Sequence, residues 1–145
     1  MAYSSKDFGR TPSAIVPEIP EKLVHRQVER TNRDEPFSRE RKHPVFVVDL
    51  PSRVLSVTIG GLEPGQTTSK HRHTYETILY VLEGEGVTEI EGHRVEWRAG
   101  DAVYIPVWAW HQHTNRSATS SCRYVACENA PQMQNLGAAV REEAG

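Results

Sequence analysis

Residues 65–115 begin with GQTTSKHRH (65–73) and end with GDAVYIPVWAWHQHTN (100–115). Four of the seven histidines of the chain lie in this segment, as two His-x-His pairs at 71/73 and 111/113. A β-strand alternates its side chains between two faces, so both members of each pair point to the same side. Neutral imidazole is the commonest protein ligand of transition metals. Two such pairs, on different strands, predict a transition-metal site inside the fold.

The sequence around these pairs is typical of short β-strands joined by glycine-containing turns. The segment 77–82 is continuously apolar, which is typical of a strand buried on both faces, and 87–91 alternates between apolar and polar residues. Gly-rich turns stand at 60–61 and 83–86. Many short strands at regular spacing predict an all-β antiparallel sandwich or barrel over residues 45–128.

The two ends of the chain have a different character. Residues 1–44 are polar and rich in proline, and predict an irregular arm, with a short helix over 21–30, that packs on the barrel or on a partner subunit. Residues 129–145 predict a loosely held tail, with a possible helix over 136–143.

Length and composition narrow the class of protein. A chain of 145 residues suits one domain of ordinary size. The formal net charge of −2 offers no basic face, so we expect no nucleic-acid partner. No apolar run approaches the roughly 20 residues of a membrane helix, and no signal-peptide core is seen, so we expect no membrane association and a cytoplasmic location.

The spacing of these residues resembles that of the cupin family. The first motif of the family is similar to residues 65–73 together with residues 80–84. The second motif of the family has a glycine, a proline, a histidine and an asparagine at the spacing found here. The matching positions of the second motif are Gly100, Pro106, His111 and Asn115. The resemblance implies a double-stranded β-helix, or jelly roll, with a metal held inside by His71, His73 and His111.

One position departs from the family pattern. Aligning 80–84 on the family's strand puts Thr77 where a metal-binding glutamate usually stands, and the alternation of the strand places residue 77 on the face of His71 and His73. We therefore expect a three-histidine site. The alternative is that the loop flexes and the neighbouring Glu76 binds the metal.

The sequence around the two His-x-His pairs is similar to that of the gentisate dioxygenase-like cupins, whose metal is Fe(II). The resemblance implies a dioxygenase acting with O2 on a small phenolic or carboxylate substrate. It also implies a homodimer, and gives His113 a catalytic role on the substrate; otherwise His113 is a satisfied interior histidine. Imidazole ligands suit Mn, Zn, Ni and Cu as well as Fe. A non-oxidative lyase, isomerase or decarboxylase, and a small-molecule-binding barrel without catalysis, are the alternative functions.

Overall fold

The computed structural model describes residues 6, 8–9, 16–31, 36, 38–39 and 43–145 of the chain. Its core consists of two five-stranded antiparallel sheets. The first has the order β1 (Val45–Val47), β2 (Ser56–Leu62), β9 (Cys122–Glu128), β4 (Thr77–Glu83) and β7 (Ala102–Ile105). The second has the order β10 (Arg141–Glu143), β3 (His71–His73), β8 (His111–Thr114), β5 (Glu85–Ile90) and β6 (His93–Arg98).

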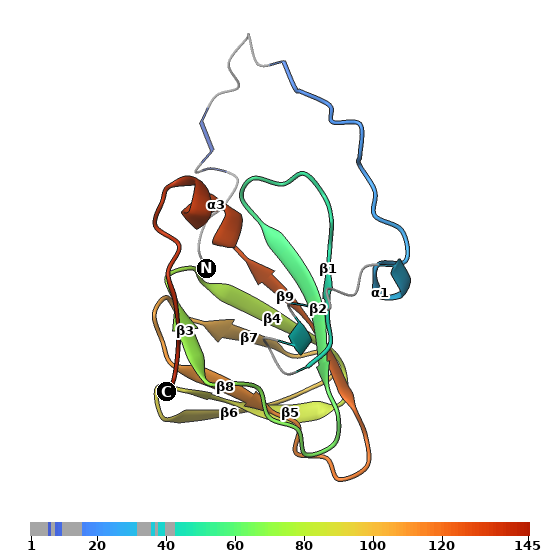
Figure 1. Cartoon of the computed structure of the whole chain (residues 1–145), viewed down its shortest axis with the longest axis vertical. Coiled ribbons are helices and arrows are strands. Elements are labelled where there is room, and N and C mark those ends of the chain that lie inside the picture. Colours follow the sequence, from blue (N-terminus) through green and yellow to red (C-terminus); the bar gives the residue numbers. More distant parts are fainter. Residues whose placement is uncertain (1–5, 7, 10–15, 32–35, 37, 40–42) are drawn as a thin grey trace.

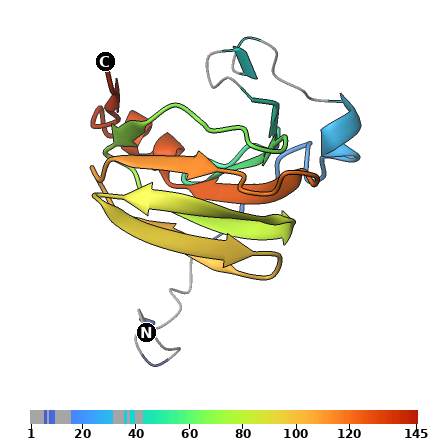
Figure 2. The ribbon, with the colours of Figure 1, turned by 90° about the horizontal axis from the view of Figure 1, so that it is seen from below.

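The two sheets face one another as a jelly roll, which is the all-β fold that the sequence predicted. In Figure 1, β5, β6 and β8 of the second sheet lie below β2, β4 and β9 of the first, and Figure 2 shows the same layers from below. Neighbouring strands within a sheet are mostly far apart in the sequence, as β2 and β9 are. The fold therefore brings the two His-x-His segments, on β3 and β8, into the same sheet.

Apolar side chains that alternate along the strands fill the space between the sheets. On β4, Leu79 and Val81 are buried in this core, whereas Ile78 and Tyr80 point outward and are about half exposed. The expectation that residues 77–82 are buried on both faces was therefore wrong. The rest of the core cluster comprises Leu62, Ile90, Trp97, Val103, Ile105, Ala109, Cys122 and Tyr124.

The tight turn between β4 and β5 depends on Gly84. Its φ of +81° lies in the left-handed region that favours glycine. A Cβ atom at this position would lie 2.7 Å from the carbonyl oxygen of Ser121. The turn can therefore pack closely against the start of β9.

The N-terminal segment is mostly not helical. Within residues 21–30, all of which the structure describes, the chain is helical only from residue 28, where α1 (Val28–Thr31) begins, so the helix predicted over 21–30 was wrong for most of its length. Leu23 and Val24 are both more than half exposed, and a short helix without an apolar contact is marginal in water. Figure 1 shows residues 16–27 as an extended segment outside the barrel. It is tied to the barrel by polar contacts, including the ion pair between Lys22 and Asp49.

The C-terminal segment is more ordered than predicted. A short helix, α3 (Ala130–Asn135), precedes β10, so the helix expected over 136–143 was wrong. Strand β10 pairs with the edge of β3, and an ion pair between Arg72 and Glu142 supports this pairing. Backbone pairing along a sheet edge thus replaces the predicted helix. Among the described residues, no helix has the length and apolar character needed to cross a membrane.

Candidate metal centre

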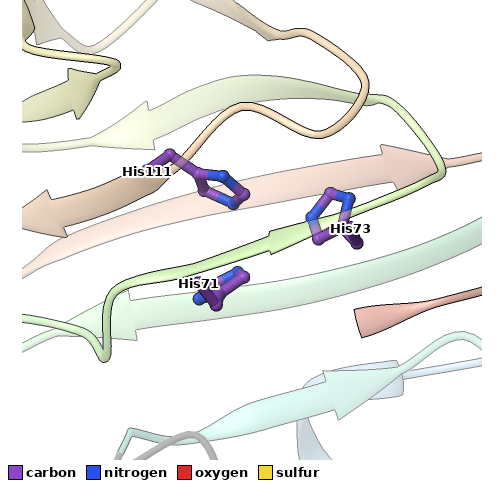
Figure 3. Close-up of side chains that lie close together, drawn as sticks. All are labelled: His71, His73 and His111. Carbon is purple, nitrogen blue, oxygen red and sulfur yellow. The ribbon is translucent and has the colours of Figure 1, made fainter. Parts of the chain in front are cut away.

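Three buried histidines meet between the sheets. His71 and His73 lie on β3 and His111 lies on β8, and one ring nitrogen from each comes within 4.8 Å of those of the other two. Figure 3 shows the three imidazoles turned toward a common point. The ring centroids of His71 and His111 are 4.3 Å apart, and those of His73 and His111 are 4.9 Å apart.

The strand register produces this convergence. His71 and His111 are direct partners across the β3–β8 pair, so their side chains leave the sheet side by side on the same face. His73 is two residues further along β3 and shares that face, whereas Arg72 between them points outward and stacks on Trp108 and Trp110. The alternation expected from the sequence therefore holds for the first pair.

Each of the three imidazoles is oriented by a main-chain carbonyl. The Nδ1 atoms of His71, His73 and His111 lie 3.1, 2.6 and 2.9 Å from a carbonyl oxygen two residues away along the chain. A carbonyl oxygen only accepts, so each Nδ1 donates, and in the neutral ring Nε2 then carries the lone pair. This outer hydrogen bond is the usual way in which proteins fix a metal-binding tautomer.

The fourth histidine of the two pairs has a different partner. His113 is buried, and its Nδ1 lies 2.7 Å from the hydroxyl of Thr88 on the neighbouring strand β5. The same hydroxyl accepts a hydrogen bond of 2.8 Å from the indole nitrogen of Trp97. Thr88 is buried, and among the described residues these are its side-chain hydrogen bonds, so the hydroxyl proton finds an acceptor when Thr88 donates to Nδ1 of His113. The proton of His113 then lies on Nε2, the opposite tautomer to that of the other three rings.

Burial keeps His113 neutral. Loss of water contact is the main cause that lowers its pKa to about 3, and the nearby rings of His111, His43 and His73 add to the effect. A neutral ring with a proton on Nε2 can donate a hydrogen bond to a ligand in the cavity. His113 is thus suited to contact a substrate, and the three other imidazoles are suited to contact a metal.

All four histidines line one cavity between the sheets. The space open to the centres of water molecules is about 70 Å³, several times the roughly 10–15 Å³ that a single water needs. Its wall is mixed, with polar groups near the histidines and an apolar side formed by residues such as Leu79 and Ile105. The other lining residues are His43, Val45, Thr58, Gly60, Thr68, Thr77, Tyr124, Ala126 and Glu128.

Thr77 lies in this cavity and Glu76 does not. Thr77 is 4% exposed and points inward on β4, as its alternation predicted. The Glu76 carboxylate accepts a hydrogen bond of 2.7 Å from the hydroxyl of Tyr104 and is exposed. Glu76 also lies outside the three-histidine group, so the structure does not support it as a further ligand.

Glu128 is a site residue that the sequence analysis missed. It is the last residue of β9, and its carboxylate accepts a hydrogen bond of 2.6 Å from Thr77. Its Oε2 atom lies 3.8 Å from Nε2 of His73. The available signal was the alternation along β9, because Cys122, Tyr124 and Ala126 are followed at the same parity by this acidic residue.

The donor set fits a divalent transition metal. Three neutral imidazoles with lone pairs on a common side are suited to Zn, Cu, Fe and Ni. Glu128 is not a member of the three-histidine group whose ring nitrogens lie within 4.8 Å of one another, but its carboxylate lies beside that group, next to His73. The described residues can therefore provide three nitrogen ligands, with a carboxylate and a histidine N–H group nearby.

Comparison with known proteins agrees with this architecture. Residues 59–127 match the family described as the cupin domain. A 5-aminosalicylate 1,2-dioxygenase of Comamonas sp. is 36% identical over 76 residues, which cover 52% of this chain and 20% of the relative. A gentisate 1,2-dioxygenase of Aquipseudomonas alcaligenes is 33% identical over 89 residues, covering 55% of this chain and 26% of the relative. The chain thus matches only a fifth to a quarter of the length of these relatives.

A solved structure shows the same barrel. The salicylate 1,2-dioxygenase of Pseudaminobacter salicylatoxidans superposes with a TM-score of 0.67 and 25% sequence identity, over 76% of this chain and 33% of that one. Residues 59–127 of the barrel are therefore similar to the cupin domain, and the sequence relatives of the chain include proteins named as 5-aminosalicylate and gentisate 1,2-dioxygenases.

Proposed function

We propose that the chain is a metal-dependent oxidoreductase of the dioxygenase type, acting on a small phenolic or carboxylate compound. The main observation behind this proposal is the convergence of three imidazoles, each with its Nδ1 atom hydrogen-bonded to a main-chain carbonyl oxygen. His71, His73 and His111 are the proposed ligands. The relatives named above, which are 1,2-dioxygenases by name, support the same function.

Fe(II) is the proposed metal, because it supplies redox chemistry toward O2 and a substrate when three neutral imidazoles hold it. The protein's own residues provide binding and orientation. His113 donates from Nε2 to an oxygen of the substrate, and the hydrogen bond from Thr88 keeps that proton in place. Leu79 and Ile105 form an apolar wall that excludes water from the reacting groups.

Oxygen consumption by the iron-loaded protein tests this proposal. The protein is prepared without air, loaded with Fe(II), and offered gentisate, salicylate, catechols and diketones in an oxygen-electrode cell. We expect oxygen uptake with loss of the aromatic absorbance for at least one of them. The variant His113→Gln should bind the metal and turn over at least about tenfold more slowly, as is typical for loss of a positioned catalytic group.

An absence of oxygen uptake on every compound would contradict the dioxygenase assignment. Turnover of a substrate without O2 would instead favour a lyase, isomerase or decarboxylase, in which the metal acts as a Lewis acid. The homodimer and the cytoplasmic location stay predictions. Light scattering of the purified protein and fractionation of cells test them.

A further inference from the structure

Glu128 places a carboxyl group in the cavity, next to the proposed metal ligands. Among the described lining residues it is the only acidic side chain, and none is lysine or arginine. Its Oε2 atom lies 3.8 Å from Nε2 of His73. A ligand that binds beside the three imidazoles therefore meets a carboxylate on that side.

The position of this carboxylate is set by the sheet. Glu128 and Thr77 are direct partners across the β4–β9 pair, so their side chains leave the sheet on the same face. The Thr77 hydroxyl donates a hydrogen bond of 2.6 Å to Oε2. The Glu128 side chain is only 21% exposed. It is thus held in place by a neighbour rather than moving freely in solvent.

The cavity also offers hydrogen-bond donors. His113 presents its Nε2 proton, as argued above, and the Tyr124 hydroxyl is buried without a partner among the described residues. Burial, and to a smaller extent the nearby Cys122, raises the pKa of Tyr124, so this hydroxyl keeps its proton. The lining thus combines a carboxyl acceptor, at Glu128, with donors at His113 and Tyr124.

We propose that the site selects neutral substrates that present an O–H or N–H group to Glu128, as a catechol or an aminophenol does. It disfavours substrates whose carboxylate has to lie there. A carboxylate only accepts hydrogen bonds, so it cannot pair with Glu128 and adds a like charge in a partly buried place. This inference rests on the proposed function and narrows its substrate from phenolic or carboxylate compounds to phenolic ones. Glu128 is the specificity-determining residue, and Thr77 positions it.

Binding to the zinc-loaded protein tests the inference without oxygen chemistry, because Zn(II) is not redox-active. Titration calorimetry gives the Kd of catechol and of salicylate, which differ by a hydroxyl in place of a carboxylate. The ratio of the two Kd values is measured in the wild type and in Glu128→Gln. Glu76→Gln is the matched control, since it removes a carboxylate from the outer surface.

We expect Glu128→Gln to shift the ratio about tenfold toward salicylate, which is the size of effect expected for a hydrogen bond to a charged group. Glu76→Gln should leave the ratio unchanged. Thr77→Val keeps the carboxylate and removes the hydroxyl that holds it, so a smaller shift in the same direction is expected. Thermal unfolding and zinc content of each variant confirm that it is folded and loaded.

A ratio that stays within about twofold of the wild type in Glu128→Gln would overturn the inference, because a hydrogen bond to the charged group predicts more. So would the failure of both probes to bind the zinc-loaded wild type. These outcomes are separate from the oxygen test. Oxygen uptake with salicylate as substrate would support the dioxygenase function and contradict this selectivity. A shift in the ratio of the two Kd values, without oxygen uptake on any compound, would support the selectivity and contradict the dioxygenase function.

Discussion

The indole nitrogen of Trp97 donates a hydrogen bond of 2.8 Å to the hydroxyl of Thr88, and both side chains are buried in the barrel. The same hydroxyl contacts Nδ1 of His113 at 2.7 Å. The indole of Trp97, on the neighbouring strand β6, thus donates to the hydroxyl that contacts a site residue, and leaves the hydroxyl proton available to Nδ1 of His113. Core packing and the orientation of the site are coupled through this pair.

The variant Thr88→Val tests the coupling. It leaves the indole N–H and Nδ1 of His113 without their shared partner, so we expect the free energy of unfolding to fall by about 2 kcal/mol. Nitrogen-15 spectra of the histidine rings should show His113 losing its preference for the Nε2-protonated form. Thr119→Val removes an exposed hydroxyl and should change neither quantity. An unchanged spectrum in Thr88→Val would show that the tautomer has another cause.

The sequence predicted the histidine cluster better than the rest of the site. The period of two along a strand is a local property, so the shared face of His71 and His73 could be read directly from their spacing. The contribution of Glu128 depends on which strand lies beside β4. That neighbour is β9, more than 40 residues later in the chain, and no local pattern specifies the pairing.

Thr77 stabilises the folded state through Glu128. The substitution Thr77→Val keeps the shape of the side chain and removes the 2.6 Å hydrogen bond. A hydrogen bond to a charged group contributes about 1.5–3 kcal/mol, so we expect a loss of about that size in the free energy of unfolding. Thr77→Ser keeps the hydroxyl and should recover most of it. Equal stability of the Val and wild-type proteins in chemical denaturation would contradict this role.

The ends of the chain were predicted least well, for a related reason. Residues 136–143 have a composition that suits a helix, but the edge of β3 offers unpaired backbone groups to Arg141, Glu142 and Glu143. Pairing along a sheet edge satisfies these groups, and tertiary context overrides the weak helix preference. In the arm, Leu23 and Val24 remain more than half exposed, so burial of apolar side chains contributes little to a helix there.

Gly86 is required by the close approach of Trp97. A Cβ atom at position 86 would collide with the indole ring and would lie 2.5 Å from the carbonyl oxygen of Thr114. Because backbone atoms on β8 cannot move away without breaking the sheet, we expect Gly86→Ala to cost about 1–3 kcal/mol of stability. Gly9→Ala has nothing within 4 Å of the new atom and should be neutral. Thermal and denaturant unfolding measure both, and a neutral Gly86→Ala would mean that β5 and β8 adjust more easily than their pairing indicates.

His111 provides the third imidazole, and without it two ring nitrogens remain. We expect the metal content of His111→Ala after gel filtration to be well below one ion per chain, as measured by mass spectrometry of the metal. His93→Ala removes an exposed histidine on β6 and should retain the wild-type content. A metal that binds only the folded state adds about 2.7 kcal/mol to the free energy of unfolding at a hundredfold excess over its Kd. Zinc should therefore raise the melting temperature of the wild type and of His93→Ala, but not that of His111→Ala. If His111→Ala keeps one tightly bound ion and the same melting shift, the three imidazoles do not act together as ligands, and the metal site lies elsewhere.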